Sequence, residues 1–135
     1  KGKQGDHLSA VNDYSKAINI NPEDERAYAN SAYSKGILED YQGAILDYSK
    51  VIEINPNNGI AYLNRGVEKD HLKDYRGAIS DYTKSIELNS NEYRGYLNRG
   101  FAKEKMNDLD DACADWRKAS ELGNRRASVV ELDKC

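Results

Sequence analysis

The sequence is poor in the residues that mark several classes of protein. Its 135 residues include only two cysteines, far too few for a disulfide framework, and only two histidines. No apolar run approaches the length needed to cross a bilayer. The net charge of −3 gives no general attraction to nucleic acid or to an anionic membrane surface. These absences favour a soluble protein that binds neither nucleic acid nor membranes.

The residues that are present follow a period of 34. The segment 62–66 reads Tyr-Leu-Asn-Arg-Gly, and the segment 96–100 reads the same. Asp-Tyr-x-Gly-Ala-Ile occurs at 40–45 and again at 74–79. A fixed period of this length is typical of a solenoid built from one supersecondary unit. With Glu25 as slot 1, the chain divides into a partial repeat at 1–24, full repeats at 25–58, 59–92 and 93–126, and a tail at 127–135.

Each repeat carries two helical patterns, because apolar residues recur at spacings of three and four rather than in alternation. Small residues at slots 8 and 20 allow the two helices of a repeat to approach closely beside an aromatic residue at slot 24. Aspartates at slot 16 (Asp6, Asp40, Asp74 and Asp108) precede each second helix as caps. The predicted helices are 7–20, 25–37, 41–54, 59–71, 75–88, 93–105, 109–122 and 126–134.

The pattern resembles the tetratricopeptide repeat family over all 135 residues. The resemblance rests on the period, the aromatic and small slots, and the Asn-Pro pairs at 21–22 and 55–56. It implies an all-α fold, a right-handed α-solenoid of helical hairpins with the tail as a capping helix. Two slots depart from the family. Its usual leucine at slot 7 is Ser31, Arg65 and Arg99 here, and its aromatic residue at slot 11 is lysine.

The two arginines at slot 7 replace a residue of the core, so each guanidinium needs a partner. Slot 23 is aspartate in every repeat and lies at the same level of the neighbouring helix. We therefore predict the ion pairs Arg65–Asp81 and Arg99–Asp115.

Side chains that face away from the second helices line the inner, concave wall of the predicted stack. Several are apolar without an expected intramolecular partner, which favours a peptide-binding groove over a solvated face or one covered by the rest of a parent protein. An asparagine in each repeat would hydrogen-bond a peptide backbone, and an apolar row would take its side chains. The candidate groove residues are Asn30, Tyr33, Leu63, Asn64, Val67, His71, Arg94, Leu97, Asn98, Phe101 and Lys105.

Some members of the resembled family grip a partner's C-terminal carboxylate with a two-carboxylate clamp. At the slots of that clamp only Asn64 and Arg94 fit, the latter with arginine in place of lysine. The sequence is therefore not that of a chaperone-tail binder. Arg94 and Lys105 instead favour an acidic residue near the third repeat in the partner.

The sequence holds no Ser-His-Asp or Cys-His arrangement and no glycine-rich phosphate loop, so we do not expect an enzyme. A metal site needs three or four converging ligands, and neither histidine has a second one at suitable spacing, so we expect no metal and no cofactor. The favoured function is a protein–protein interaction scaffold for a peptide segment of unidentified origin. The alternative is a structural spacer or self-association segment of a longer solenoid.

The chain starts at Lys1 without a methionine, in the middle of a repeat and with no visible signal peptide. We expect a fragment of a longer, cytoplasmic protein, with export as the alternative. The helix at 7–20 lacks most of its hairpin partner, so Tyr14 should be exposed for its slot or covered by self-association.

Cys113 faces the tail helix, which should run antiparallel and bring Cys135 near. The sequence leaves open whether the two cysteines are bonded, because terminal residues commonly fray. A disulfide would favour an oxidising compartment.

Overall fold

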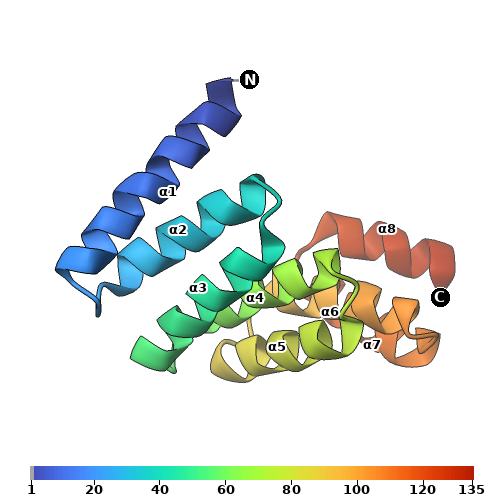
Figure 1. Ribbon diagram of the computed structural model, residues 1–135. Coiled ribbons are helices and arrows are strands. Elements are labelled where there is room, and N and C mark those ends of the chain that lie inside the picture. The colour runs from blue at the N-terminus through green and yellow to red at the C-terminus, as the bar shows by residue number, and fades with distance from the viewer. Residues whose placement is uncertain (1) are drawn as a thin grey trace.

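A computed structural model describes residues 2–135, with side chains from residue 5 onward, as an all-helical stack (Figure 1). Every predicted helix except the first agrees with the structure to within one residue. The helices are α1 Gly2–Ile20, α2 Glu25–Ile37, α3 Tyr41–Ile54, α4 Gly59–His71, α5 Tyr75–Leu88, α6 Tyr93–Lys105, α7 Leu109–Glu121 and α8 Arg125–Lys134.

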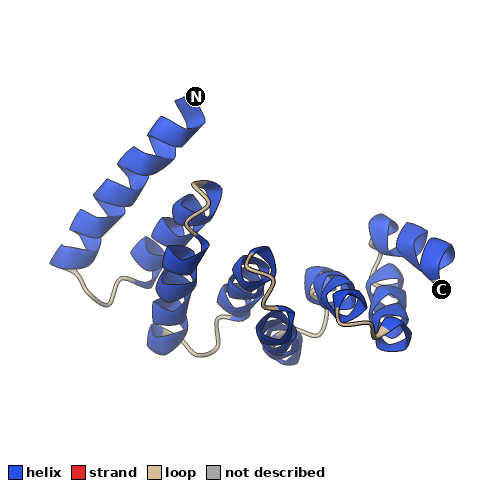
Figure 2. Ribbon diagram, turned by 45° about the vertical axis from the view of Figure 1, so that its right-hand side comes forward, coloured by secondary structure: helices blue, strands red, loops and turns tan. Residues whose placement is uncertain are grey.

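Each helix packs mainly against the helices before and after it in the chain, and α4 also touches α6. This order produces antiparallel hairpins that follow one another along the molecule, with α1 at one end and α8 at the other (Figure 2). The solenoid predicted from the sequence is confirmed. We call α2, α4 and α6 the first helices, and α1, α3, α5 and α7 the second helices.

The start of α1 was predicted wrongly. Asp6 was expected to cap a helix that begins at residue 7, but α1 begins at Gly2 and runs through Asp6. The segment on either side of Asp6 is part of one continuous helix, so Asp6 is not a cap.

The later slot 16 aspartates do cap their helices. Asp40 and Asp74 each accept a hydrogen bond of 3.0 Å from the backbone N–H of the glycine three residues on. A Cβ on Gly43 would lie 2.2 Å from the Asp40 carboxylate, so the absence of a side chain makes room for the cap. The third repeat has Asp111 in that slot, and the hydrogen bond that the Asp111 backbone N–H donates to the Asp108 carboxylate lengthens to 3.4 Å.

In each of the hairpins α4–α5 and α6–α7, an aromatic ring of the second helix packs against the glycine at slot 8 of the first helix. Tyr82 and Trp116 are fully buried. A Cβ on Gly66 would lie 2.6 Å from Tyr82 Cε1, and one on Gly100 would lie 2.4 Å from Trp116 Nε1. Contacts this short leave no room for a side chain, so glycine sets the distance between the helices.

Both predicted ion pairs are present beside this contact. Arg65 donates from Nε and Nη2 to the two Asp81 oxygens at 2.8 and 2.7 Å. Its remaining Nη1 donates to Ser49 Oγ of the preceding repeat at 3.1 Å. Arg99 repeats the arrangement with Asp115 and with Thr83. Each guanidinium therefore joins its own hairpin to the repeat before it.

Each of these aspartates also has a second cationic partner that the repeat pattern did not predict. Lys69 Nζ lies 3.0 Å from an Asp81 oxygen, and Lys103 Nζ lies 3.0 Å from Asp115. In the first full repeat Asp47 receives Lys35 at 2.9 Å, with the Ser31 hydroxyl at 2.7 Å where the other repeats have arginine. The lysine at slot 11 therefore contributes its charge as well as its aliphatic stem. The same aspartates gather all of these contacts.

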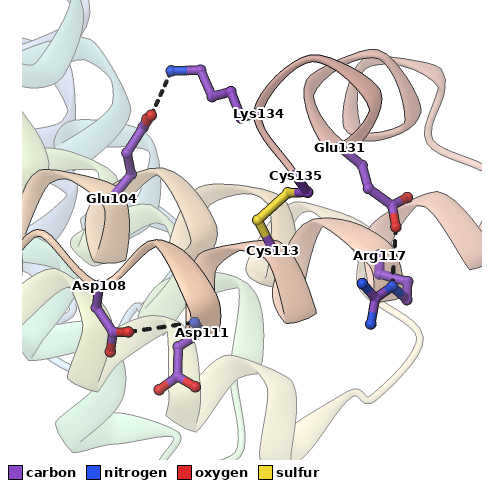
Figure 3. Close-up of a disulfide and its surroundings, with 8 residues drawn as sticks. All are labelled: Glu104, Asp108, Asp111, Cys113, Arg117, Glu131, Lys134 and Cys135. Carbon is purple, nitrogen blue, oxygen red and sulfur yellow. Dashed lines mark hydrogen bonds and ion pairs between the residues drawn. A yellow bond between two sulfur atoms is a disulfide. The ribbon is translucent and has the colours of Figure 1, made fainter.

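A disulfide between Cys113 and Cys135 fastens the end of α8 to α7, with 6.0 Å between the Cα atoms (Figure 3). The expected proximity of the two cysteines is confirmed. Two ion pairs lie around the disulfide, Arg117–Glu131 at 3.0 Å and Lys134–Glu104. Together they close the C-terminal end of the stack.

We predict that Gly100→Ala lowers the free energy of unfolding by about 1–3 kcal/mol, because the new methyl group overpacks the Trp116 contact. Gly66→Ala should cost less. Ala32 already occupies the same slot beside a buried Tyr48, and alanine regains about 1 kcal/mol of helix propensity. Urea unfolding of the two variants measures the difference.

The control combines Gly100→Ala with Trp116→Tyr, which recreates the alanine–tyrosine combination of the first full repeat. In the Trp116→Tyr background the glycine substitution should be neutral or stabilising. Equal losses in both backgrounds would contradict the role assigned to the aromatic ring.

Candidate functional site

The candidate site is the face that the first helices turn away from the second helices. The structure divides the predicted groove residues by exposure. Those at the surface are Asn30, Tyr33, His71, Arg94 and Lys105, those half-buried are Asn64, Val67, Asn98 and Phe101, and those buried are Leu63 and Leu97.

The placement of Leu63 and Leu97 in the groove was wrong, because both belong to the core. Leu63 is 1% exposed and packs in one cluster with Tyr82 and with Ala102 of the next first helix. Leu97 packs in one cluster with Trp116 and with residues of α7 and α8. Slot 5 therefore fills the seam between successive first helices and is not available to a ligand.

Phe101 and Val67 are partly committed to the core as well. The Phe101 ring lies 5.3 Å from the Trp116 ring, and the Arg126 guanidinium of α8 lies 4.9 Å from its centre. Val67 packs against the cluster around Tyr82. Neither side chain is free to serve as a deep anchor for a ligand.

The apolar surface that remains open is concentrated on α2 and the start of α4. Tyr33 is 60% exposed, and Ile37, one helical turn later on the same face, is 43% exposed. Ile60 on α4 is 44% exposed. Tyr33 also lies edge-on to the His7 ring of α1, at 6.1 Å. The most exposed apolar side chains of this face therefore lie on α2 and at the start of α4, toward the N-terminal end of the stack.

The asparagines at slot 6 of the three full repeats differ in exposure. Asn30 is exposed, whereas Asn64 and Asn98 are half-buried. Asn64 lies beside the hydroxyl of Tyr48, whose pKa is raised to about 12 by burial and by the nearby Glu68 carboxylate, with Asn64 opposing the change. Asn30 has the amide most accessible to a ligand.

Two carboxylates lie at the junctions between the first helices. Asp70 accepts a hydrogen bond from the Tyr82 hydroxyl, and burial raises the pKa of Asp70. Glu68 is only 8% exposed, and its Oε1 has no hydrogen-bond partner among the described residues. Burial raises the pKa of Glu68, with the nearby His71 opposing that rise.

Glu68 was missed by the sequence analysis, although its slot gave a signal. The other first helices have Ser34 and Ala102 at slot 10, both small and buried. A Cβ on Gly36 would lie 2.8 Å from Glu68 Oε2, so glycine in α2 makes room for the long acidic side chain of α4. At the next pair of first helices the residue types at these slots are reversed, with Asp70 at slot 12 of α4 and Ala102 at slot 10 of α6.

The basic groups of the face are only partly available. Arg94 is held by Glu92 on the cap of its own helix, at 2.6 Å. Lys105 is exposed at the end of α6. His71 is exposed but stacks on Tyr41, with 4.5 Å between the ring centres and 7° between the planes. Among the predicted groove residues, Lys105 is the cation best placed to meet an acidic group.

Neither a metal-binding cluster nor a membrane-spanning helix occurs in the described part of the chain. Across residues 5–135 no group of three His, Cys, Asp or Glu side chains is arranged to hold a metal ion. Of the helices in residues 2–135, none combines the length and apolarity needed to span a membrane.

Comparison with known protein families identifies the repeat. A family model described as "Tetratricopeptide repeat" matches residues 25–58 and 60–92. No curated protein sequence matches the chain.

Solved structures share the fold. MamA is 24% identical, over 90% of this chain and 71% of that one, with a TM-score of 0.85. The tetratricopeptide domain of Arabidopsis OM64 is 26% identical, over 81% and 92% of the two chains, with a TM-score of 0.78. The first such domain of Spaghetti (RPAP3), solved bound to the HSP90 peptide SRMEEVD, is 24% identical, over 81% and 88%, with a TM-score of 0.77.

We predict that Glu68→Gln stabilises the protein at pH 7 by roughly 1 kcal/mol, because it removes a buried charge with an unpaired oxygen. A carboxyl group whose pKa is raised on folding contributes stability only while it is protonated. The advantage of the variant should therefore shrink as the pH falls through the raised pKa of Glu68, and it should reach its minimum near pH 4.3, about the usual pKa of glutamate. Urea unfolding at a series of pH values measures it.

The matched control is Glu23→Gln, which removes an exposed glutamate from the α1–α2 turn. It should change stability little at any pH. A pH-independent gain in Glu68→Gln would show that the burial of charge is not the cause.

Proposed function

The chain belongs to the tetratricopeptide repeat family, and on that premise we propose that it is an interaction scaffold that binds an extended peptide segment along its first helices. Domains of this family generally mediate protein–protein interactions. The observation that carries the proposal is the open aromatic and aliphatic surface of α2, where Tyr33 and Ile37 share one face beside the exposed Asn30.

Tyr33 is the proposed anchor. A tyrosine offers a large apolar area and a polar tip at low entropic cost, which is why tyrosine is frequent among residues that dominate binding energy. In this chain most of that area is in solvent, although the slot 9 residues Val67 and Phe101 are largely covered. The Asn30 amide, one turn earlier, would hydrogen-bond the backbone of the bound segment.

The segment would continue across α4 and α6. Asn64 and Asn98 offer part of their amides along this path, and His71 and Arg94 border it. Lys105 at its far end favours an acidic residue in the partner. The domain of Spaghetti bound to SRMEEVD supports peptide binding as a use of this fold, although this chain lacks most of the clamp slots of the family.

We predict that Tyr33→Ala combined with Asn30→Ala weakens binding of a selected peptide about tenfold or more, as expected for removal of a central anchor. The peptide would come from a library screen against the wild-type chain, and isothermal titration would give the affinities. Both side chains are exposed, so stability should not change.

Leu46→Ala is the matched control, since it removes a side chain that is 71% exposed on the second helix α3. Equal binding by the wild type and the double variant would remove this face from consideration. A chain that selects no peptide and only associates with itself would favour the spacer function instead.

A further inference from the structure

Three carboxylates occupy equivalent places on the binding face of successive first helices. Asp70 and Glu104 are the slot 12 residues of α4 and α6, one helical turn after slot 9 of that face. Helix α2 has Gly36 at slot 12, and a Cβ there would lie 2.8 Å from Glu68 Oε2. The carboxylate of Glu68 therefore fills the place that the missing side chain of α2 leaves open.

Among the described residues, Glu68 differs from the other two carboxylates in its partners. Asp70 accepts a hydrogen bond from the Tyr82 hydroxyl, and Glu104 pairs with the Lys134 ammonium group. Glu68 Oε1 is buried and has no hydrogen-bond donor within the described chain. A buried carboxylate oxygen without a donor has lost its hydration and received nothing in return. The Glu68 site is therefore incomplete, and a further donor would complete it.

The side chains around Glu68 do not balance its charge. Burial, and next the Glu68 carboxylate and Tyr33, raise the pKa of the Tyr48 hydroxyl to about 12, so the two tyrosines lie in the same cluster as the acid. His71 opposes the rise in the pKa of Glu68, but its ring is stacked on Tyr41. Burial still raises the pKa of Glu68 overall. A cation that approaches closely is what this cluster lacks.

The fold does not require an acid at slot 10. The other first helices have Ser34 and Ala102 there, and both close their part of the stack with small buried side chains. Glu68 adds a buried charge and needs a glycine opposite to make room for it. Residues that break a local packing rule at a cost in stability are expected at functional sites. The position of Glu68 on the proposed binding face favours a role in binding.

We propose that Glu68 is a specificity-determining residue of this face and accepts a lysine or arginine side chain of the bound segment. This inference rests on the proposed function and adds to it the chemistry of the partner. The terminal torsion of a glutamate is soft, so the carboxylate turns toward a donor without a change of rotamer. Tyr33 precedes Gly36 by one turn on α2, so its exposed ring lies beside the path of the cation and attracts it.

The proposal gives the bound segment a charge pattern. Its basic residue lies where α2 meets α4, at Glu68, and its acidic residue lies near Lys105 at the end of α6. A segment with the opposite order of charges would place an acid against the buried carboxylate. Like charges placed opposite each other in an interface suppress the wrong partner. The two ends of the face thus select the direction of the segment as well as its composition.

The first test selects peptides from one random library against the wild type, Glu68→Gln and Glu23→Gln. Both variants remove one negative charge, but Glu23 is exposed in the α1–α2 turn, away from the binding face. Glutamine keeps the size of the Glu68 side chain, so the variant should fold. We expect the wild type and Glu23→Gln to enrich lysine or arginine at one shared peptide position, and Glu68→Gln to lose that enrichment.

A double-mutant cycle on the tightest peptide of the wild-type selection measures the contact itself. Glutamine in place of its basic residue should weaken binding to the wild type about tenfold or more, as for a buried charge pair that loses one partner. The same peptide change should leave the affinity for Glu68→Gln nearly unaltered. An equal loss in both proteins, measured by isothermal titration, would show that the basic residue binds elsewhere and would overturn the proposal.

The outcomes separate this inference from the proposed function. Selected peptides that depend on Tyr33 but share no basic residue would overturn the role of Glu68 and leave the binding face in place. Enrichment of a neutral donor such as serine or asparagine would do the same, because the site would then need a hydrogen bond and not a charge. A wild-type chain that selects no peptide at all would overturn both.

Discussion

A buried aspartate at slot 23 gathers the contacts on which the rest of the stack depends. Taking a carboxylate out of water is costly unless cations and hydrogen bonds replace the lost hydration. Asp81 accepts two hydrogen bonds from Arg65 and forms an ion pair with Lys69, and the same guanidinium donates a third hydrogen bond to Ser49 of the preceding repeat. One interaction thus fixes the two helices of a hairpin and the position of that hairpin on its neighbour.

The geometry of the binding face follows from this arrangement. The ion pair holds the two helices of a hairpin at the level where the Tyr82 or Trp116 ring packs against the glycine at slot 8. The aromatic face of each of these second helices is therefore buried in the core. The first helices are left with a surface built from slots 2, 6, 9 and 13. The slot 5 residues Leu63 and Leu97 are buried in the core. Tyr33 is therefore the most exposed aromatic residue of the face.

Periodicity made the helices and the ion pairs predictable, because both depend on spacing along one helix and on the level of its antiparallel neighbour. The Arg65–Asp81 pair needed nothing more. The burial of Leu63 depends on how closely α4 and α6 approach, and no single repeat specifies that distance. The burial of Glu68 depends on the absence of a side chain at Gly36 in the preceding repeat. A comparison of equivalent slots does not reveal such a contact, because it treats each repeat separately.

The central claim is that charge pairing at slot 23 couples the helices of each hairpin. A double-mutant cycle on the most C-terminal pair measures it directly, with unfolding free energies for the wild type, Arg99→Ala, Asp115→Ala and the double variant. The account predicts a coupling free energy of roughly 2 kcal/mol, as found for residues that share a buried network. Additive losses, with coupling near zero, would show that each side chain acts alone and would contradict the account.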